Sequence, residues 1–229
     1  MIESCVEKIL RKHFGYTEIL FEDIRDFYNS YLHPDKINLD DEDVYKNIFH
    51  DAKWAGVFQF TETGAQNFCS NVKPNSIIDI SAITSIFRPG PLSAQVDKNY
   101  VNAIRAPENV KYLNDIHREV TEETYGFLIF QEQIALLAHL LGKKLSLDEG
   151  NLLRKVLTKK GTGKGHEVKE GIYKKFCDGC LEKGVSQRDA DELWSSFEFF
   201  SGYGFNKSHA VSYSILSYQC AWLLNYYPA

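Results

Sequence analysis

The apolar run VSYSILSYQCAWLLNYY, residues 211–227, constrains the fold most strongly. It predicts a long buried helix over residues 208–227, which Pro228 ends because proline cannot continue a helix. A chain of 229 residues with 44% hydrophobic residues is long enough to surround such a helix with a sizeable core. No uninterrupted apolar run reaches the roughly 20 residues that cross a bilayer.

The rest of the sequence predicts a mainly helical fold with a few short strands. WAGVFQF, residues 54–60, is β-like, and YGFLIF, residues 125–130, is a buried strand or a helix entry. Further helices are expected over residues 2–13, 18–31, 63–72, 131–142, 146–157 and 185–200.

Helix starts carry local capping signals. Ser146 with Glu149 forms one expected capping box, and Ser186 with Asp189 forms another. An acid-rich helix start follows Asn38, with Asp40 or Asp41 as its cap. These signals fix where several helices begin.

The negative charge of the chain is concentrated at its N-terminal end. Residues 1–50 hold eleven acidic and six basic residues, a net charge of −5 that equals the net charge of the whole chain. The first residues, MIESCVEKILRK, are charged and amphipathic and lack the apolar core of a signal peptide, so we expect a cytoplasmic location.

Cys177 and Cys180 form the single CxxC pattern in the sequence. A structural zinc site needs a second pair of ligands at suitable spacing, and none is present. We therefore interpret both residues as free thiols rather than as a metal or redox site.

The densest basic cluster is RKVLTKKGTGK, in which no acidic residue separates the cations. Fixed cations on a helix followed by a glycine-containing loop suit phosphate binding, whereas a solvated charged surface is the alternative. The spacing does not match a Walker A loop. The cluster consists of Arg154, Lys155, Lys159, Lys160 and Lys164.

Arg88 is a second candidate because Pro89 and Pro91 stiffen the backbone directly after it. Its guanidinium either faces a ligand or pairs with a nearby acid such as Asp97.

The SGYGFNKSHA stretch, residues 201–210, leads directly into the long helix. Ser208 and His209 are adjacent, so on a helix they point about 100° apart and cannot act as nucleophile and base. Either Ser208 or Asn206 is expected to cap the helix. The capped end with Lys207 also suits phosphate binding, and the two interpretations are compatible.

Two acid patterns, residues 41–43 and residues 189–191, are candidate metal ligands. Neither lies between apolar strand residues, as the carboxylates of a two-metal transferase would. We therefore expect both patterns to be surface acids.

Taken together, five motifs resemble C-family replicative DNA polymerases, the bacterial DNA polymerase III alpha subunits and their phage relatives. The resemblance covers about residues 38–229, and the last motif is the longest and most specific. The motifs, in order, are GVFQFTETG, SIFRPGPL, TYGFLIFQEQI, LLRKVLTKKGTGK and FSGYGFNKSHAVSYSILSYQCAWLLNYYPA.

The resemblance implies a helical fingers domain over residues 46–229, preceded by an acidic palm-to-fingers connection over residues 1–45. In the family, this domain closes over the incoming deoxynucleoside triphosphate and contacts template and primer DNA. The residues that match the nucleotide-binding positions are Arg88, Arg154, Lys155, Lys159, Asn206, Lys207, Ser208, His209 and Tyr213, whereas Lys160 and Lys164 are expected to contact DNA.

The sequence departs from the family pattern by placing Lys155 where a second arginine is usual, which retains the charge but loses the bidentate fork. The family's PHP domain, its palm aspartates and its C-terminal segments are absent from the sequence. We therefore expect a piece of a DNA-directed DNA polymerase, a nucleotidyltransferase, that is inactive alone. Its catalytic Mg²⁺ would bind only in the assembled enzyme. The alternative is a stand-alone nucleic-acid-binding or regulatory module.

Overall fold

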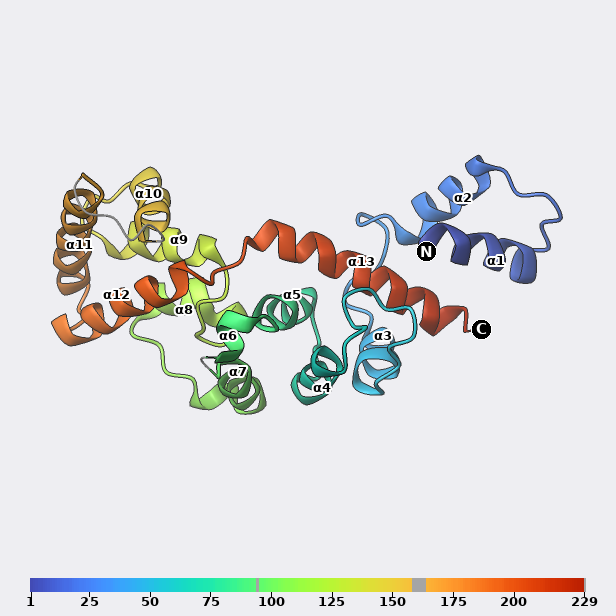
Figure 1. Cartoon of the computed structure of the whole chain (residues 1–229), viewed down its shortest axis with the longest axis horizontal. Coiled ribbons are helices and arrows are strands. Elements are labelled where there is room, and N and C mark those ends of the chain that lie inside the picture. Colours follow the sequence, from blue (N-terminus) through green and yellow to red (C-terminus); the bar gives the residue numbers. More distant parts are fainter. Residues whose placement is uncertain (94, 158–163, 229) are drawn as a thin grey trace. The chain divides into compact units, whose positions relative to one another are not determined.

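The computed structural model describes residues 1–93, 95–157 and 164–228 (Figure 1). Within these residues the fold is almost entirely helical, as expected, and comprises thirteen α-helices with short π- and 3₁₀-helical turns. None of the helices in these ranges is both long and apolar enough to span a bilayer.

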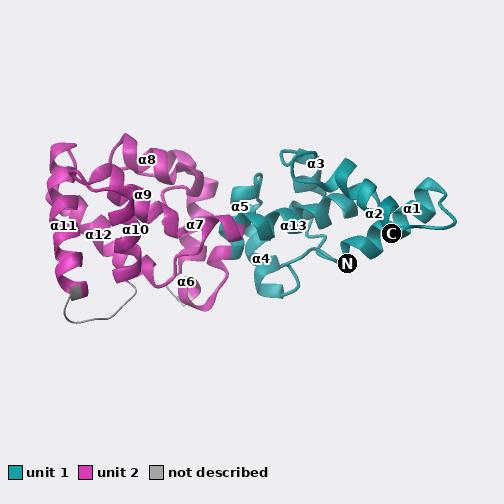
Figure 2. Ribbon diagram, turned by 90° about the horizontal axis from the view of Figure 1, so that it is seen from above, with its two compact units in different colours: residues 1–84, 211–229 teal, residues 85–210 magenta. Residues whose placement is uncertain are grey.

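The chain forms two compact units (Figure 2). The first contains residues 1–84 and 211–229, and the second contains residues 85–210. The chain passes from one unit to the other within α5 (Ile77–Ile86) and within α13 (Lys207–Tyr226). The domain boundary expected near residue 45 lies inside the first unit and stays a prediction.

The first unit packs around the C-terminal part of α13. The Tyr218 ring lies 5.3 Å from the Tyr45 ring, and its hydroxyl donates to the Asn38 carbonyl at 2.8 Å. Because α13 is apolar on several sides, it can be covered from several directions. Besides the part of α5 up to Thr84, the other helices of this unit are α1 (Ile2–Phe14), α2 (Phe21–Phe27) with the π-turn Tyr28–Leu32, α3 (Glu42–Val44) with the π-turn Tyr45–His50, and α4 (Thr63–Val72).

Residues 54–60 do not form the expected strand. Val57 N–H donates to the Trp54 carbonyl, and Phe60 N–H donates to the Val57 carbonyl, which makes successive turns. Gln59 adopts a positive φ of 68°, which a strand does not allow. Val57 and Phe60 are buried in the first unit, and Trp54 and Phe58 are partly buried there, instead of lying on a sheet.

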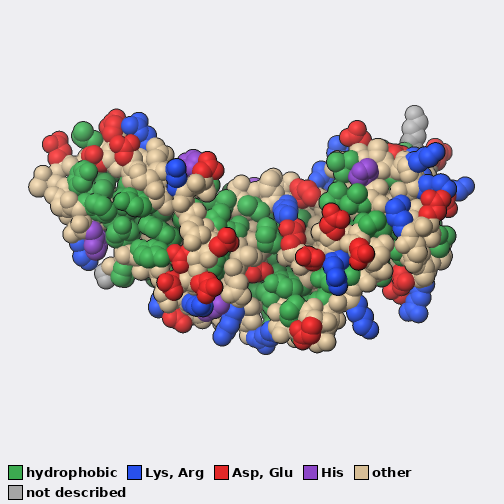
Figure 3. All heavy atoms as spheres, turned by 180° about the vertical axis from the view of Figure 1, so that it is seen from behind, with side chains coloured by type: hydrophobic (Ala, Val, Ile, Leu, Met, Phe, Trp, Pro, Cys, Tyr) green, Lys and Arg blue, Asp and Glu red, His purple; other side chains and the backbone are tan. Residues whose placement is uncertain are grey.

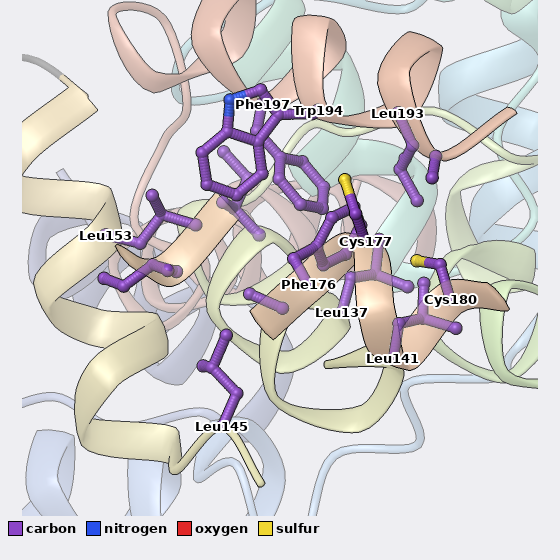
Figure 4. Packing of buried hydrophobic residues seen from close by; sticks show 14 of the residues in the cluster. Leu137, Leu141, Leu145, Leu153, Phe176, Cys177, Cys180, Leu193, Trp194 and Phe197 are labelled. Atoms are coloured by element: carbon purple, nitrogen blue, oxygen red, sulfur yellow. The ribbon is translucent and has the colours of Figure 1, made fainter. Parts of the chain in front are cut away.

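The second unit is a helical bundle. Its core lies among four helices, and Figure 4 shows side chains from α9, α10, α11 and α12 meeting there. The helices of the unit after α5 are α6 (Pro89–Ser93), α7 (Val96–Arg105), α8 (Asp115–Thr121), α9 (Gln131–Leu141), α10 (Leu147–Leu157), α11 (Lys164–Glu182) and α12 (Gln187–Ser201), with 3₁₀ turns at Pro107–Asn109 and Glu122–Thr124.

The close approach of α11 to the end of α9 depends on Gly179. A Cβ built on Gly179 would lie 2.2 Å from the Leu141 carbonyl oxygen and 2.3 Å from the Lys143 nitrogen. The neighbouring Cys177 and Cys180 are free thiols buried in the same core (Figure 4). Burial raises the pKa of Cys180 to about 12, so its thiol stays protonated and packs as a small apolar group.

Candidate nucleotide-binding site

A short loop, residues 202–206, joins α12 to α13. This α12–α13 loop lies beside the residues that precede α9. Phe205 N–H donates to the Ile129 carbonyl at 3.0 Å, and Gln131 N–H donates to the Phe205 carbonyl at 2.9 Å. The resulting parallel bridge between Phe130 and Phe205 is what remains of the strand expected at YGFLIF, which also serves as the entry to α9.

A second contact comes from the Arg88 side chain at the start of α6. Its Nε donates to the Ser85 carbonyl at 2.9 Å, and its Nη2 donates to the Tyr203 carbonyl at 2.6 Å. The guanidinium lies 4.5 Å from the centre of the Phe205 ring. Burial lowers the pKa of Arg88. The pairing with Asp97 that the sequence left open is not among the ion pairs of the described residues. Arg88 instead holds the α12–α13 loop in place through its contacts with Tyr203 and Phe205.

Two glycines allow these close contacts. A Cβ on Gly90 would lie 2.1 Å from the Tyr203 ring, so only glycine leaves room for the ring there. A Cβ on Gly204 would lie 3.0 Å from Gln131 Cγ and 3.1 Å from the Phe200 carbonyl oxygen, and the Gly204 carbonyl accepts from Gln131 Nε2 at 2.7 Å. The loop is therefore held by contacts with residues of the SIFRPGPL and TYGFLIFQEQI motifs.

Asn206 caps α13 and is one of the two alternative caps that the sequence predicted. Its Oδ1 accepts the His209 N–H at 2.9 Å and the Ser208 hydroxyl at 2.7 Å. Its Nδ2 donates to Glu132 Oε1 at 2.7 Å. The His209 ring lies 5.4 Å from the Phe205 ring, which places the exposed Ser208 and His209 next to the loop.

Lys207 is bound to two carboxylates. Its ammonium donates to Glu123 Oε1 at 2.6 Å and to Glu123 Oε2 at 2.7 Å, and its backbone N–H donates to Glu132 Oε2 at 2.9 Å. The two glutamates are the residues of this site that the sequence analysis missed. Glu123 lies 84 positions before Lys207, and no local pattern connects the two.

The basic cluster is placed only in part. Arg154 and Lys155 lie in the last turn of α10, where Arg154 is half-buried and Lys155 is exposed. Lys159 and Lys160 lie outside the described residues. Lys164 begins α11, and the structure does not describe its side chain.

Arg154 differs from many other cations of the second unit. Lys169, Lys175 and Lys207 each form an ion pair with a glutamate. The Arg154 guanidinium has no ion-pair or hydrogen-bond partner among residues that the structure describes. A half-buried arginine without an opposing carboxylate is a suitable position for an anion.

The residues predicted from the sequence to bind nucleotide are divided between the two units. Arg88, Arg154 and the segment from Asn206 to His209 lie in the second unit. Tyr213 lies in the first, where its ring centre is 5.5 Å from that of Phe58.

Charge is mixed on one face of the molecule. On the face shown in Figure 3, acidic and basic side chains alternate and are not segregated by sign. No group of three or more histidine, cysteine or acidic side chains that could hold a metal ion occurs within residues 1–93, 95–157 and 164–228.

Comparison with known proteins gives consistent matches. Residues 17–184 match the family model described as the bacterial DNA polymerase III alpha subunit finger domain. The chain is 36% identical over 192 residues to the DNA polymerase III subunit alpha of Borreliella burgdorferi, covering 83% of this chain and 16% of that protein. It is 34% identical over 218 residues to the same subunit of Neisseria meningitidis serogroup B, covering 95% of this chain and 18% of that protein. The chain thus spans about one sixth of the length of these curated relatives.

Proposed function

Because the chain belongs to the family of bacterial DNA polymerase III alpha subunit finger domains, we propose that it is the fingers part of a replicative DNA polymerase. In this role it holds the incoming deoxynucleoside triphosphate and contacts the template and primer. The catalytic aspartates and their Mg²⁺ ions belong to other domains, so the chain alone is inactive.

The observation that carries this proposal is the state of Arg154. Its guanidinium lies half-buried at the end of α10 and lacks a carboxylate partner among the described residues. A triphosphate supplies the missing negative charge, and the planar fork of arginine binds two phosphate oxygens at once. Lys155, Lys159 and the segment from Asn206 to His209 are proposed to add further donors, and Lys160 and Lys164 to contact DNA.

The contribution of these residues is positioning and charge neutralisation. Phosphoryl transfer depends on the alignment of the attacking and leaving oxygens and on balancing the charge of the phosphates. The α12–α13 loop suits this role because Arg88, Gln131 and Glu132 already fix its geometry. The loop therefore needs little ordering when a nucleotide binds.

The test is Arg154→Ala in the assembled polymerase, assayed by single-nucleotide primer extension. One charge-assisted hydrogen bond contributes about 1.5–3 kcal/mol, so kcat/KM for the nucleotide should fall roughly 10- to 150-fold, with a higher KM. Arg188→Ala is the matched control, since Arg188 is exposed and pairs only with Glu192 on its own helix among the described ion pairs. Equal kinetics for the two variants would refute the assignment of Arg154, and nucleotide incorporation by the isolated chain would refute its inactivity.

A further inference from the structure

The start of α13 already holds acceptors in the positions where phosphate oxygens are expected. The Lys207 ammonium contacts both oxygens of Glu123, and the Lys207 backbone N–H contacts Glu132. The second oxygen of Glu132 accepts from Asn206. Carboxylate and phosphate oxygens compete for the same donors, so an arriving phosphate has to replace one of these contacts.

The charges at this point disfavour a phosphate. Glu123 contacts the Lys207 ammonium, and Glu132 contacts the Lys207 backbone N–H and the Asn206 amide, so these three charged side chains carry a net charge of −1 beside the start of the helix. The side chains of Lys207 and Glu123 are each 34% exposed, so water screens their interaction only in part. An additional anion is therefore repelled as long as both carboxylates remain in place.

The two glutamates differ in how they are held. Glu132 lies in the first turn of α9 and bonds to backbone and to the Asn206 cap, so it belongs to the same network as the Phe130–Phe205 bridge. Glu123 lies in the 3₁₀ turn Glu122–Thr124, and its side-chain contacts described in the structure are with the flexible end of Lys207. Glu123 can release Lys207 without disturbing the helix cap.

We propose that Glu123 is a positioning residue that holds Lys207 in the nucleotide-free state and that the triphosphate replaces it on the Lys207 ammonium. Glu132 keeps its contacts throughout and maintains the helix cap. This inference rests on the proposed function, because it assumes that the start of α13 meets phosphate. Beyond that function, it predicts that phosphate binds by replacing Glu123 on the Lys207 ammonium. The affinity for phosphate is therefore lower than it would be without Glu123.

The experiment measures binding of inorganic tripolyphosphate to the full chain by titration calorimetry at low ionic strength. Glu123→Gln should bind tripolyphosphate roughly threefold to tenfold more tightly than the unchanged chain, because one competing charge is removed. Glu123→Asp retains the negative charge, so this variant should bind tripolyphosphate with about the affinity of the unchanged chain. The gain should vanish when Lys207→Met is added to Glu123→Gln.

The outcomes separate this inference from the proposed function. If Glu123→Gln binds like the unchanged chain while Arg154→Ala still weakens binding, the exchange is wrong and the proposed function stands. If Glu123→Gln tightens binding equally with and without Lys207→Met, the gain is a general effect of charge and the exchange at Lys207 is refuted. If neither the unchanged chain nor Glu123→Gln binds tripolyphosphate, both the exchange and the phosphate site at this helix are refuted.

Discussion

Replacement of Gln133 by leucine should weaken the segment on which the α12–α13 loop rests. The Gln133 side chain is 3% exposed and lies in the first turn of α9. Its Oε1 accepts the N–H groups of Ile129 and Phe130, both at 2.9 Å. Its Nε2 donates to the Val120 carbonyl at 3.2 Å and to the Thr124 hydroxyl at 2.8 Å.

The expected loss of stability comes mainly from the two backbone N–H groups. Thr124 keeps other partners, because its hydroxyl also donates to the Thr121 and Phe127 carbonyls. Leucine has no acceptor, so the Ile129 and Phe130 N–H groups lose their partner within the described structure. Each such buried group costs about 1–3 kcal/mol, and the added apolar burial offsets about 1–2 kcal/mol. The two groups together cost about 2–6 kcal/mol, so we expect a net loss of about 1–4 kcal/mol.

Two measurements test this expectation on the full chain. Urea unfolding followed by circular dichroism gives the change in free energy of unfolding, and hydrogen exchange reports on the amides of Ile129, Phe130 and Phe205. Gln187→Leu is the matched control, since the exposed Gln187 donates one surface hydrogen bond to Asp191 at 2.8 Å. The reasoning is refuted if both variants lie within about 0.5 kcal/mol of each other and the three amides exchange at unchanged rates.

Two further predictions concern the second unit. Gly179→Ala should destabilise the second unit by about 3 kcal/mol or more, because the alanine Cβ would meet backbone atoms at the end of α9 at 2.2–2.4 Å. Gly171→Ala on the same helix is the matched control, since its Cβ would meet nothing within 4 Å. This second variant should stabilise the unit by about 0.5–1 kcal/mol. Thermal unfolding of both variants checks this pair, and a shift of the same sign in both would contradict it. Burial lowers the pKa of His117, whose Nδ1 accepts the Leu113 N–H at 3.3 Å. The His117 imidazole is therefore protonated at higher pH in the unfolded chain than in the folded chain. As a result, the free energy of unfolding falls as pH drops below about 6.5. His117→Gln should reduce that fall by up to about 1.4 kcal/mol per pH unit, as measured by urea unfolding at pH 7.5 and at lower pH; an identical pH dependence in both proteins would rule out His117 as its source.

Helix starts could be predicted from the sequence because their signals lie within four residues. Glu149 N–H donates to the Ser146 hydroxyl at 3.2 Å while Ser146 N–H donates to the Glu149 carboxylate at 2.9 Å, which is the reciprocal capping box that was expected. Asp41 caps α3, and Asn206 rather than Ser208 caps α13. In each case the side chain and the backbone group that it satisfies are fixed by local geometry alone.

The partners of the candidate site could not be predicted in the same way. Arg88 contacts Tyr203 across 115 positions, and Lys207 contacts Glu123 across 84. Such partners follow from how the helices pack, which a single sequence does not specify. The prediction of a strand over residues 54–60 was wrong for a related reason. Packing in the first unit, with Gln59 at a positive φ, determined the backbone there rather than the β-like composition.

The packing of the α12–α13 loop explains why rings, glycines and donors occur together before an apolar helix. Tyr203 covers Gly90, Phe205 lies below the Arg88 guanidinium, and the Gly204 carbonyl accepts from Gln131. The rings and glycines therefore serve to fix the loop, and the donors of Lys207 have partners before any substrate arrives. The phosphate binding that we propose at this position is then an exchange of acceptors on an ordered loop, which avoids the entropy cost of ordering a free one. It follows that the affinity for phosphate here depends on the strength of the carboxylate contacts that phosphate replaces, and that weakening the contact from Glu123 should increase it.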